Sequence, residues 1–431
     1  MSKTNRNIAI GCGAGCLLIV VLLGVAVSHF YKTFISPVTS ALTMSAELQQ
    51  PGVKKGVGFL TRREFASFPR FDFITDLQYG NFDGQAGEEI AVVGYQGVVL
   101  LDKDTGKKKS ESQLNLGGPI KGGAATTMDW DTVVSGYNGS SLEIVPYQQS
   151  YLLMKVTDKE SIALLDKHGK ELWLQYLSGK KGQTSKDDGY ACAGDVNGDG
   201  LPEVAISENS SGKIRLYDKS GKEHWQQKGA PQVYGILMVD TNGDGKEELI
   251  TGDESGKVVI YDQTGKIIKH VYVADYYPDN KSFGQAKFSL YQQSEQAGLP
   301  YLLTYTREMD KKATGKFLLI GFDGKLKQSL KAPDLGVIMI RAKGVPVKLV
   351  AGQPEYTAIL AAGAEGMLSI SNIVLSIYDS TGKLVYQEVL DMPGKTIIAV
   401  PSDQNGTESL LLGMGGKVVA YSAASIKNNK P

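Results

Sequence analysis

The feature that most constrains this chain is a sequence unit that occurs twice in succession, at residues 195–225 and 240–270. The first copy reads DVNGDGLPEVAISENSSGKIRLYDKSGKEHW, and the second reads DTNGDGKEELITGDESGKVVIYDQTGKIIKH. The second copy begins 45 residues after the first, and its acidic residues, glycines and closing turn stay in register with those of the first. A repeat of roughly 20–50 residues indicates stacked supersecondary units that bury a continuous core between them.

The opening of each unit has the ligand spacing of a calcium-binding loop. Oxygen-bearing side chains stand at positions 1, 3, 5 and 9, a glycine stands at position 6, and position 7 offers its backbone carbonyl. The donors of the first loop are Asp195, Asn197, Asp199, Leu201 (through its carbonyl) and Glu203. The donors of the second loop are Asp240, Asn242, Asp244, Lys246 (through its carbonyl) and Glu248. Because Ca²⁺ takes roughly 6–8 oxygen ligands, we predict a structural Ca²⁺ ion in both loops.

The last carboxylate of each loop is followed by a strand-like sequence, which differs from an EF-hand, where the loop is longer and leads into a helix. The alternative interpretation is a plain turn, because Asp, Asn and Gly all favour turns. Two copies with every ligand position filled favour calcium. A weaker candidate loop has Asn81, Asp83, Gln85 and Glu89 at positions 1, 3, 5 and 9. Two of these four side chains are amides, so we expect weak binding or none there.

The closing turn of the unit recurs along the chain. It reads LLDKDTGKK from Leu100, LLDKHGKELW from Leu164, LYDKSGKEHW from Leu216, IYDQTGKIIKH from Ile260, IYDSTGKLVYQ from Ile377 and, more weakly, GFDGKLKQ from Gly321. The acidic loops resemble the FG-GAP or VCBS repeats of β-propellers, a family that includes the integrin α-subunit head. The turns resemble the outer hairpins of quinoprotein-type propeller blades. Both resemblances imply an all-β chain folded as a single β-propeller, but they imply different functions.

We expect seven four-stranded blades, and six or eight remain open because the second, fifth and sixth units are irregular. The third unit is expected to form strands at residues 190–194, 203–207, 213–217 and 223–227. The seventh unit lacks one strand, and we expect residues 56–64 to supply it, because such closure removes exposed sheet edges. Trp173 and Trp225 follow closing turns and are expected to pack between neighbouring blades.

The N-terminus predicts a membrane anchor, because residues 8–27 carry no charged side chain and about 20 apolar residues cross a bilayer. Lys3 and Arg6 precede this run, so the positive-inside rule places the N-terminus in the cytoplasm and the large domain on the periplasmic or extracellular side. The predicted division is a cytoplasmic segment 1–7, a transmembrane signal-anchor helix 8–29, a linker 30–55, a β-propeller 56–424 and a polar tail 425–431. Signal cleavage near Ala26 with secretion, and lipidation at Cys12 or Cys16, remain alternatives.

Composition narrows the function. Lys plus Arg and Asp plus Glu number 46 each, so the chain has no net basic charge for binding nucleic acid. Beyond the apolar run only Cys192 remains, so the large domain is expected to form no internal disulfide. The chain has four histidines and none of the G-x-S-x-G, H-E-x-x-H or P-loop motifs, so we predict no catalytic residues.

The expected function is that of a membrane-anchored, extracytoplasmic module that binds a protein or glycan partner. The resemblance to the integrin-type propellers implies that Ca²⁺ is a structural cofactor that stiffens loops and takes part in no reaction. The alternatives are a degenerate quinoprotein-like (PQQ-type) enzyme and a scaffold in envelope assembly. A quinone chromophore in the purified protein would favour the enzyme.

Overall fold

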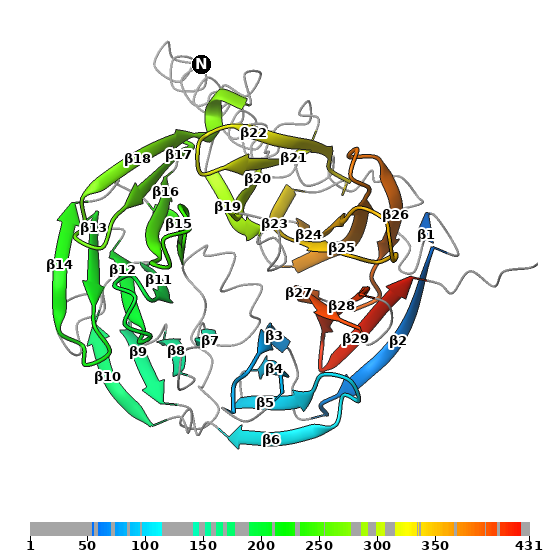
Figure 1. Ribbon diagram of the computed structural model, residues 1–431, viewed down its shortest axis with the longest axis horizontal. Coiled ribbons are helices and arrows are strands. Elements are labelled where there is room, and N and C mark those ends of the chain that lie inside the picture. The colour runs from blue at the N-terminus through cyan, green and yellow to red at the C-terminus, as the bar shows by residue number, and fades with distance from the viewer. Residues whose placement is uncertain are drawn as a thin grey trace, which may run out of the picture.

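The chain forms short strands grouped into sheets that stand around a ring, as the computed structural model in Figure 1 shows. The structure describes residues 54–55, 59–69, 74–83, 87–94, 97–113, 141–145, 151–156, 161–166, 170–176, 189–208, 212–228, 233–253, 255–276, 286–291, 299–306, 315–333, 335, 338–365, 369–392, 394–402 and 406–423. The predicted anchor at 8–29 and the predicted tail at 425–431 lie outside these ranges, and the predicted domain boundaries stay predictions.

The described residues form seven antiparallel sheets. The first three sheets consist of β3 (Ile74–Gly80), β4 (Glu89–Gly94), β5 (Gly97–Asp102) and β6 (Lys108–Gln113); β7 (Ser141–Val145), β8 (Tyr151–Val156), β9 (Ser161–Asp166) and β10 (Glu171–Tyr176); and β11 (Gly189–Gly194), β12 (Glu203–Glu208), β13 (Lys213–Tyr217) and β14 (Glu223–Lys228). The fourth and fifth consist of β15 (Val233–Val239), β16 (Glu248–Asp253), β17 (Lys257–Tyr261) and β18 (Ile267–Tyr272), and of β19 (Ala286–Tyr291), β20 (Tyr301–Thr306), β21 (Lys316–Gly321) and β22 (Leu326–Lys331).

The last two sheets combine both ends of the described chain. The sixth consists of β23 (Ile338–Val347), β24 (Tyr356–Glu365), β25 (Ser369–Tyr378) and β26 (Leu384–Val389), with β1 (Lys54–Lys55) as a fifth strand. The seventh consists of β27 (Gly394–Pro401), β28 (Glu408–Met414) and β29 (Lys417–Ala423), with β2 (Leu60–Ser67) added beyond β29. A short 3₁₀ helix, η2 (Val273–Tyr276), follows the fourth sheet.

Burial follows the place of each strand in its sheet. In Figure 1 the strands β3, β11, β15 and β27 lie toward the centre of the ring, and β6, β14, β18 and β2 lie at its rim. The second strands β4, β12 and β16 are buried at every residue, whereas the rim strands β14 and β18 are mostly exposed. A strand covered on both faces by neighbouring sheets needs a continuous apolar run, which the residues IAVV at 90–93 of β4 provide.

The strands predicted for the third unit are confirmed to within one residue at each end. They are the four strands β11 to β14, and they pair in chain order. Within β13, Ile214 and Leu216 are buried while Arg215 between them is only half-buried. This alternation is the period of two that a strand imposes on its side chains.

The ring is closed by pairing the first long strand of the domain with the last. β2 runs antiparallel to β29, with Leu60 opposite Ala423 and Ser67 opposite Lys417. The hydroxyls of Thr61 and Ser422 also lie 3.1 Å apart. The predicted closure is therefore confirmed, although the strand is residues 60–67 and begins four residues later than expected.

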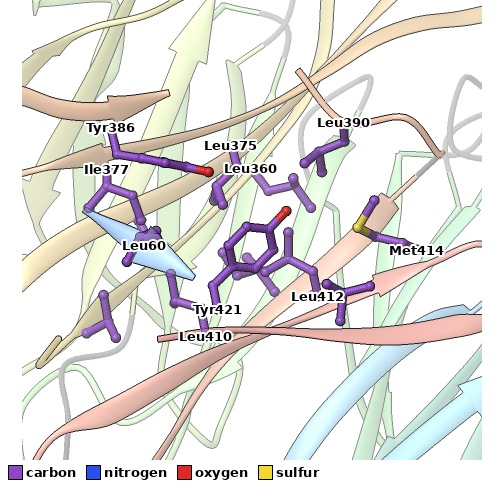
Figure 2. Packing of buried hydrophobic residues seen from close by; sticks show 14 of the residues in the cluster. Leu60, Leu360, Leu375, Ile377, Tyr386, Leu390, Leu410, Leu412, Met414 and Tyr421 are labelled. Atoms are coloured by element: carbon purple, nitrogen blue, oxygen red, sulfur yellow. The ribbon is translucent and has the colours of Figure 1, made fainter. Parts of the chain in front are cut away.

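The closing strand is fixed to the sixth sheet as well as to the seventh. The Arg62 guanidinium on β2 lies 3.4 Å from Glu388 of β26 and 2.9 Å from Asp391. Glu388 has no exposed side-chain surface, and its carboxylate also accepts the Tyr386 hydroxyl at 2.6 Å. Figure 2 shows the apolar cluster beside these groups, where Leu60 packs among side chains of both sheets. This cluster and the ion pairs of Arg62 hold β2 against the sixth sheet as well as the seventh.

The two tryptophans pack between neighbouring sheets, as predicted. Trp173 of the second sheet lies 5.9 Å, centroid to centroid, from the Tyr217 ring of the third. Trp225 of the third sheet stacks on Tyr261 of the fourth at 6.4 Å, and its indole N–H donates to the Gln263 carbonyl at 3.0 Å. Large rings at these positions fill the gap between sheets that diverge toward the rim.

Within the described ranges, no helix has the length and apolar character needed to cross a membrane.

Candidate metal-binding loops

The two repeated loops lie at equivalent places in adjacent sheets. Residues 195–203 join β11 to β12, and residues 240–248 join β15 to β16, so each loop connects the innermost strand to the second strand. Glu203 and Glu248 are the first residues of β12 and β16. The predicted position of the loops, directly before a strand, is therefore what the chain adopts.

In the first loop the side chains turn inward onto backbone N–H groups. The Asp195 carboxylate accepts the N–H of Gly198 at 2.7 Å, of Asp199 at 3.1 Å and of Gly200 at 2.8 Å. The Asn197 side-chain oxygen accepts the Asp199 N–H at 2.8 Å, and Asp199 accepts the Leu201 N–H at 2.8 Å. These bonds bring the acidic and amide side chains of positions 1, 3 and 5 to the same small loop.

The second loop repeats this scaffold. The Asp240 carboxylate accepts the N–H groups of Gly243 at 2.6 Å and Gly245 at 2.9 Å. The Asn242 oxygen accepts the Asp244 N–H at 2.8 Å, and Asp244 accepts the Lys246 N–H at 2.9 Å. Both loops need positive φ at their glycines, and Gly245 has φ of 82°. Burial opposes ionisation of Asp240, but its backbone donors outweigh it and hold the pKa of this carboxyl below its usual value.

The glutamate at position 9 is the buried member of each loop. Glu203 is 2% exposed and Glu248 is 6% exposed. Each accepts the N–H of position 2, from Val196 at 3.0 Å and from Thr241 at 2.9 Å. Each also accepts the side-chain amide of the loop asparagine, at 2.7 and 2.9 Å. The same two bonds in both loops place the glutamate against the other predicted ligands.

The electrostatics of the first loop fit a bound cation. Burial, together with the nearby charges of Asp199 and Asp195, raises the pKa of Glu203 to about 7, although the Val196 N–H bond to this carboxylate opposes the rise. A divalent ion would favour the ionised form of Glu203 beside these two carboxylates, and an all-oxygen donor set is the one Ca²⁺ takes. In the described residues, no group of three or more His, Cys, Asp or Glu side chains is arranged to hold a metal ion. The calcium assignment, which also uses amide and carbonyl oxygens, stays a prediction.

Glu247 ties the two loops together, a link that the repeat pattern alone does not predict. Its N–H donates to the Asp195 carbonyl at 3.0 Å, and its carboxylate accepts the Asp195 N–H at 2.8 Å. A Cβ on Gly194 would come within 2.1 Å of this carboxylate, so glycine is required beside the clamp. Position 1 of the first loop is thus held by the residue that precedes position 9 of the second.

The same clamp occurs once more at the seventh sheet. The Glu408 N–H donates to the Lys348 carbonyl at 2.8 Å, and its carboxylate accepts the Lys348 N–H at 2.6 Å. Burial raises the pKa of Glu408. Aligned with the fourth sheet, Glu408 corresponds to Glu247, and Ser409 stands where Glu248 stands. The predicted loss of ligands in this unit agrees with that alignment.

The weaker loop, at residues 81–89, has the same glutamate geometry but a different partner. Glu89 is fully buried and accepts the Phe82 N–H at 3.0 Å, as its counterparts do. Its other oxygen contacts the Lys109 ammonium, which also lies 3.1 Å from the Asp83 carboxylate. Glu89 first, and then Asp83, raise the pKa of Lys109. Asn81 belongs to the described residues, whereas Gln85 lies outside them.

Comparison with known proteins gives one match to a family model and likenesses to solved structures. The family model for FG-GAP-like repeats matches residues 195–251, which contain both loops. A catalytically inactive virginiamycin B lyase from Staphylococcus aureus with quinupristin has a TM-score of 0.50 at 10% identity, covering 84% of this chain and 99% of its own. BBS1N in complex with ARL6DN, soaked with mercury, has a TM-score of 0.49 at 10% identity, covering 89% and 99%. No curated protein matches the chain.

A ring of radial, mainly four-stranded antiparallel sheets defines a β-propeller. The match to the model for FG-GAP-like repeats, over residues 195–251, lies in the third and fourth sheets of this propeller. The likeness to the lyase structure, at 10% identity, shows the fold alone, because one fold supports many unrelated functions.

Proposed function

We propose that this chain is a seven-bladed β-propeller that Ca²⁺ stabilises at two adjacent blades and that binds a protein or glycan partner. Residues 8–29 anchor it in the cytoplasmic membrane, with the propeller on the periplasmic or extracellular side. The loops do no chemistry, and Ca²⁺ stiffens the connections between inner strands. The chain binds no nucleic acid, since its formal net charge is zero.

The observation that carries the proposal is the set of hydrogen bonds that the two loops share. Position 1 accepts the N–H groups of positions 4 and 6, position 3 accepts that of position 5, and position 9 accepts that of position 2 in both loops. A plain turn needs one or two such bonds. All of these hydrogen bonds occur in both loops, and both loops have the same types of ligand side chain at positions 1, 3, 5 and 9. This repetition supports a common ligand for the two loops.

Thermal unfolding in calcium and in chelator tests the metal. Ligand that binds only the folded state stabilises it by mass action, so the melting temperature is expected to be higher in calcium. The double variant Asp199→Ala and Asp244→Ala is expected to lose this difference. Asp104→Ala, an exposed carboxylate in the outer turn of the first sheet, is the control and is expected to keep it. Equal melting temperatures of the unsubstituted protein in calcium and chelator would contradict the proposal.

Binding and location have their own measurements. Pull-down with the purified propeller in calcium and in chelator is expected to recover a partner only in calcium. Protease added outside intact cells or spheroplasts is expected to digest the propeller and to leave residues 1–7 protected. The quinoprotein-like alternative predicts a quinone absorbance in the purified protein, and the binding proposal predicts none.

A further inference from the structure

The first sheet has a cation of its own where the third and fourth have predicted calcium ligands. In all three sheets the buried glutamate at position 9 accepts the N–H of position 2, at 3.0, 3.0 and 2.9 Å. Its second oxygen accepts an asparagine amide in the third and fourth sheets but contacts the Lys109 ammonium in the first. The weaker loop of the first sheet also has an acid, Asp83, where the loops of the third and fourth sheets have Asn197 and Asn242.

The backbone explains how Lys109 reaches this place. Leu101 pairs with Lys108 and Leu100 pairs with Ser110, so Lys109 is the extra residue of a β-bulge on the rim strand β6. The third and fourth sheets have bulges at the same point, and the extra residues there are His224 and Ile268. A bulge changes the direction of a side chain, and here it directs an ammonium to the loop carboxylates.

We propose that the Lys109 ammonium takes the place of a metal ion in the weaker loop, so that Asp83 and Glu89 form a latent cation site that the protein holds closed without calcium. This inference rests on the proposed calcium loops only for the identity of the ion. The charge balance is local: Lys109 lies 3.1 Å from Asp83 and contacts Glu89, which has no exposed side-chain surface. Calcium dependence is then confined to the third and fourth sheets.

The test compares Lys109→Met with Lys108→Met in the whole chain. Lys108 is the adjacent residue of β6 and makes an exposed ion pair with Glu111 at 2.8 Å, so it is a matched control. In chelator, Lys109→Met is expected to melt several degrees lower than Lys108→Met, because it leaves the buried Glu89 without its counter-charge. Added calcium is expected to raise the melting temperature of Lys109→Met by more than that of Lys108→Met, and Asp83→Asn in addition is expected to remove this excess.

Two results would overturn the proposal: equal melting temperatures of the two variants in chelator, or an equal response of the two variants to calcium. These outcomes are distinct from failure of the proposed calcium loops. That failure would appear as an unsubstituted protein with no response to calcium, whereas the comparison in chelator requires no metal.

Discussion

The indole ring of Trp225, on the rim strand of the third sheet, lies directly over Gly265 in the outer turn of the fourth. A Cβ built on Gly265 would come within 2.8 Å of this ring. Trp173 lies over Gly221 in the same way, because a Cβ built on Gly221 would come within 2.8 Å of its ring. On the closing strand β2, the Phe65 ring lies 3.1 Å from a Cβ built on Gly106. In these three places the closing turn is therefore a contact between sheets, and its glycine is the surface on which an aromatic ring of the preceding sheet rests.

Gly265→Ala is expected to destabilise the protein more than Gly324→Ala does. Both glycines have left-handed backbone, with φ of 80° and 83°, so both variants lose the same conformational freedom. A Cβ on Gly324 meets nothing within 4 Å, whereas one on Gly265 meets Trp225. Overpacking costs roughly 1–3 kcal/mol, so denaturant unfolding is expected to show about that difference. Equal losses would mean that the ring moves aside freely.

Arg62→Ala is expected to destabilise the closure of the ring by roughly 3 kcal/mol, because it leaves the buried Glu388 as an uncompensated charge. Lys417→Ala provides the comparison, since its ion pair with Glu64 in the same sheet is exposed and is expected to contribute less than about 1 kcal/mol. Chemical denaturation of both variants measures the difference. If the two lost the same free energy, Arg62 would have no special part in closure.

Acid is expected to weaken the closing turn of the sixth sheet. The Asp379 carboxylate accepts the Thr381 hydroxyl at 2.6 Å and the N–H groups of Thr381 and Lys383 at 3.0 Å each, and these bonds lower its pKa. A carboxyl whose pKa is lower in the folded state stabilises fully above its unfolded pKa of about 4, and this stabilisation is lost as pH falls through the folded value. The stability difference between the unsubstituted protein and Asp379→Ala should therefore shrink between pH 5 and pH 2. A difference that stayed constant with pH would contradict this.

Glu247→Ala and Glu408→Ala separate the clamp from the metal. Each removes a carboxylate that accepts a backbone N–H of the preceding sheet, so both are expected to lower stability by roughly 1–3 kcal/mol. Only Glu247 holds Asp195, the first predicted ligand of its loop. The rise in melting temperature caused by calcium is therefore expected to decrease in Glu247→Ala and to be unchanged in Glu408→Ala. A decrease in both variants would show that the effect is general destabilisation.

The local sequence pattern predicts the strands, but it does not predict contacts between residues that are distant in the chain. The four strands of the third sheet follow from alternation and turn residues, which are properties of neighbouring positions. The closing strand was predicted four residues too early, because its position depends on pairing with β29 and on the ion pair between Arg62 and Glu388 of the sixth sheet, and both partners are distant in the sequence.

The candidate site divides in the same way. Spacing alone predicted which side chains come together within each loop, since positions 1 to 9 are contiguous in the chain. Lys109 was not predicted, because it stands 20 residues beyond Glu89 and reaches it only through a bulge. Glu247 was missed for a related reason: it stands 52 residues beyond Asp195, and only the approach of two sheets brings them together. The sequence did contain a signal for Lys109: when the closing turns are aligned, a lysine stands in the first sheet where the third and fourth sheets have His224 and Ile268.

The pairing of β2 with β29 has a consequence for biosynthesis, since Thr61 and Ser422 are separated by 361 positions. A ribosome delivers β2 before any other strand of the seventh sheet and delivers its partner β29 last. Until β29 has been synthesised, β2 therefore presents unsatisfied backbone groups, to which a chaperone or a strand of another nascent copy can add. Closure of the ring has to wait for β29, and the pairing of strands so distant along the polypeptide is slow.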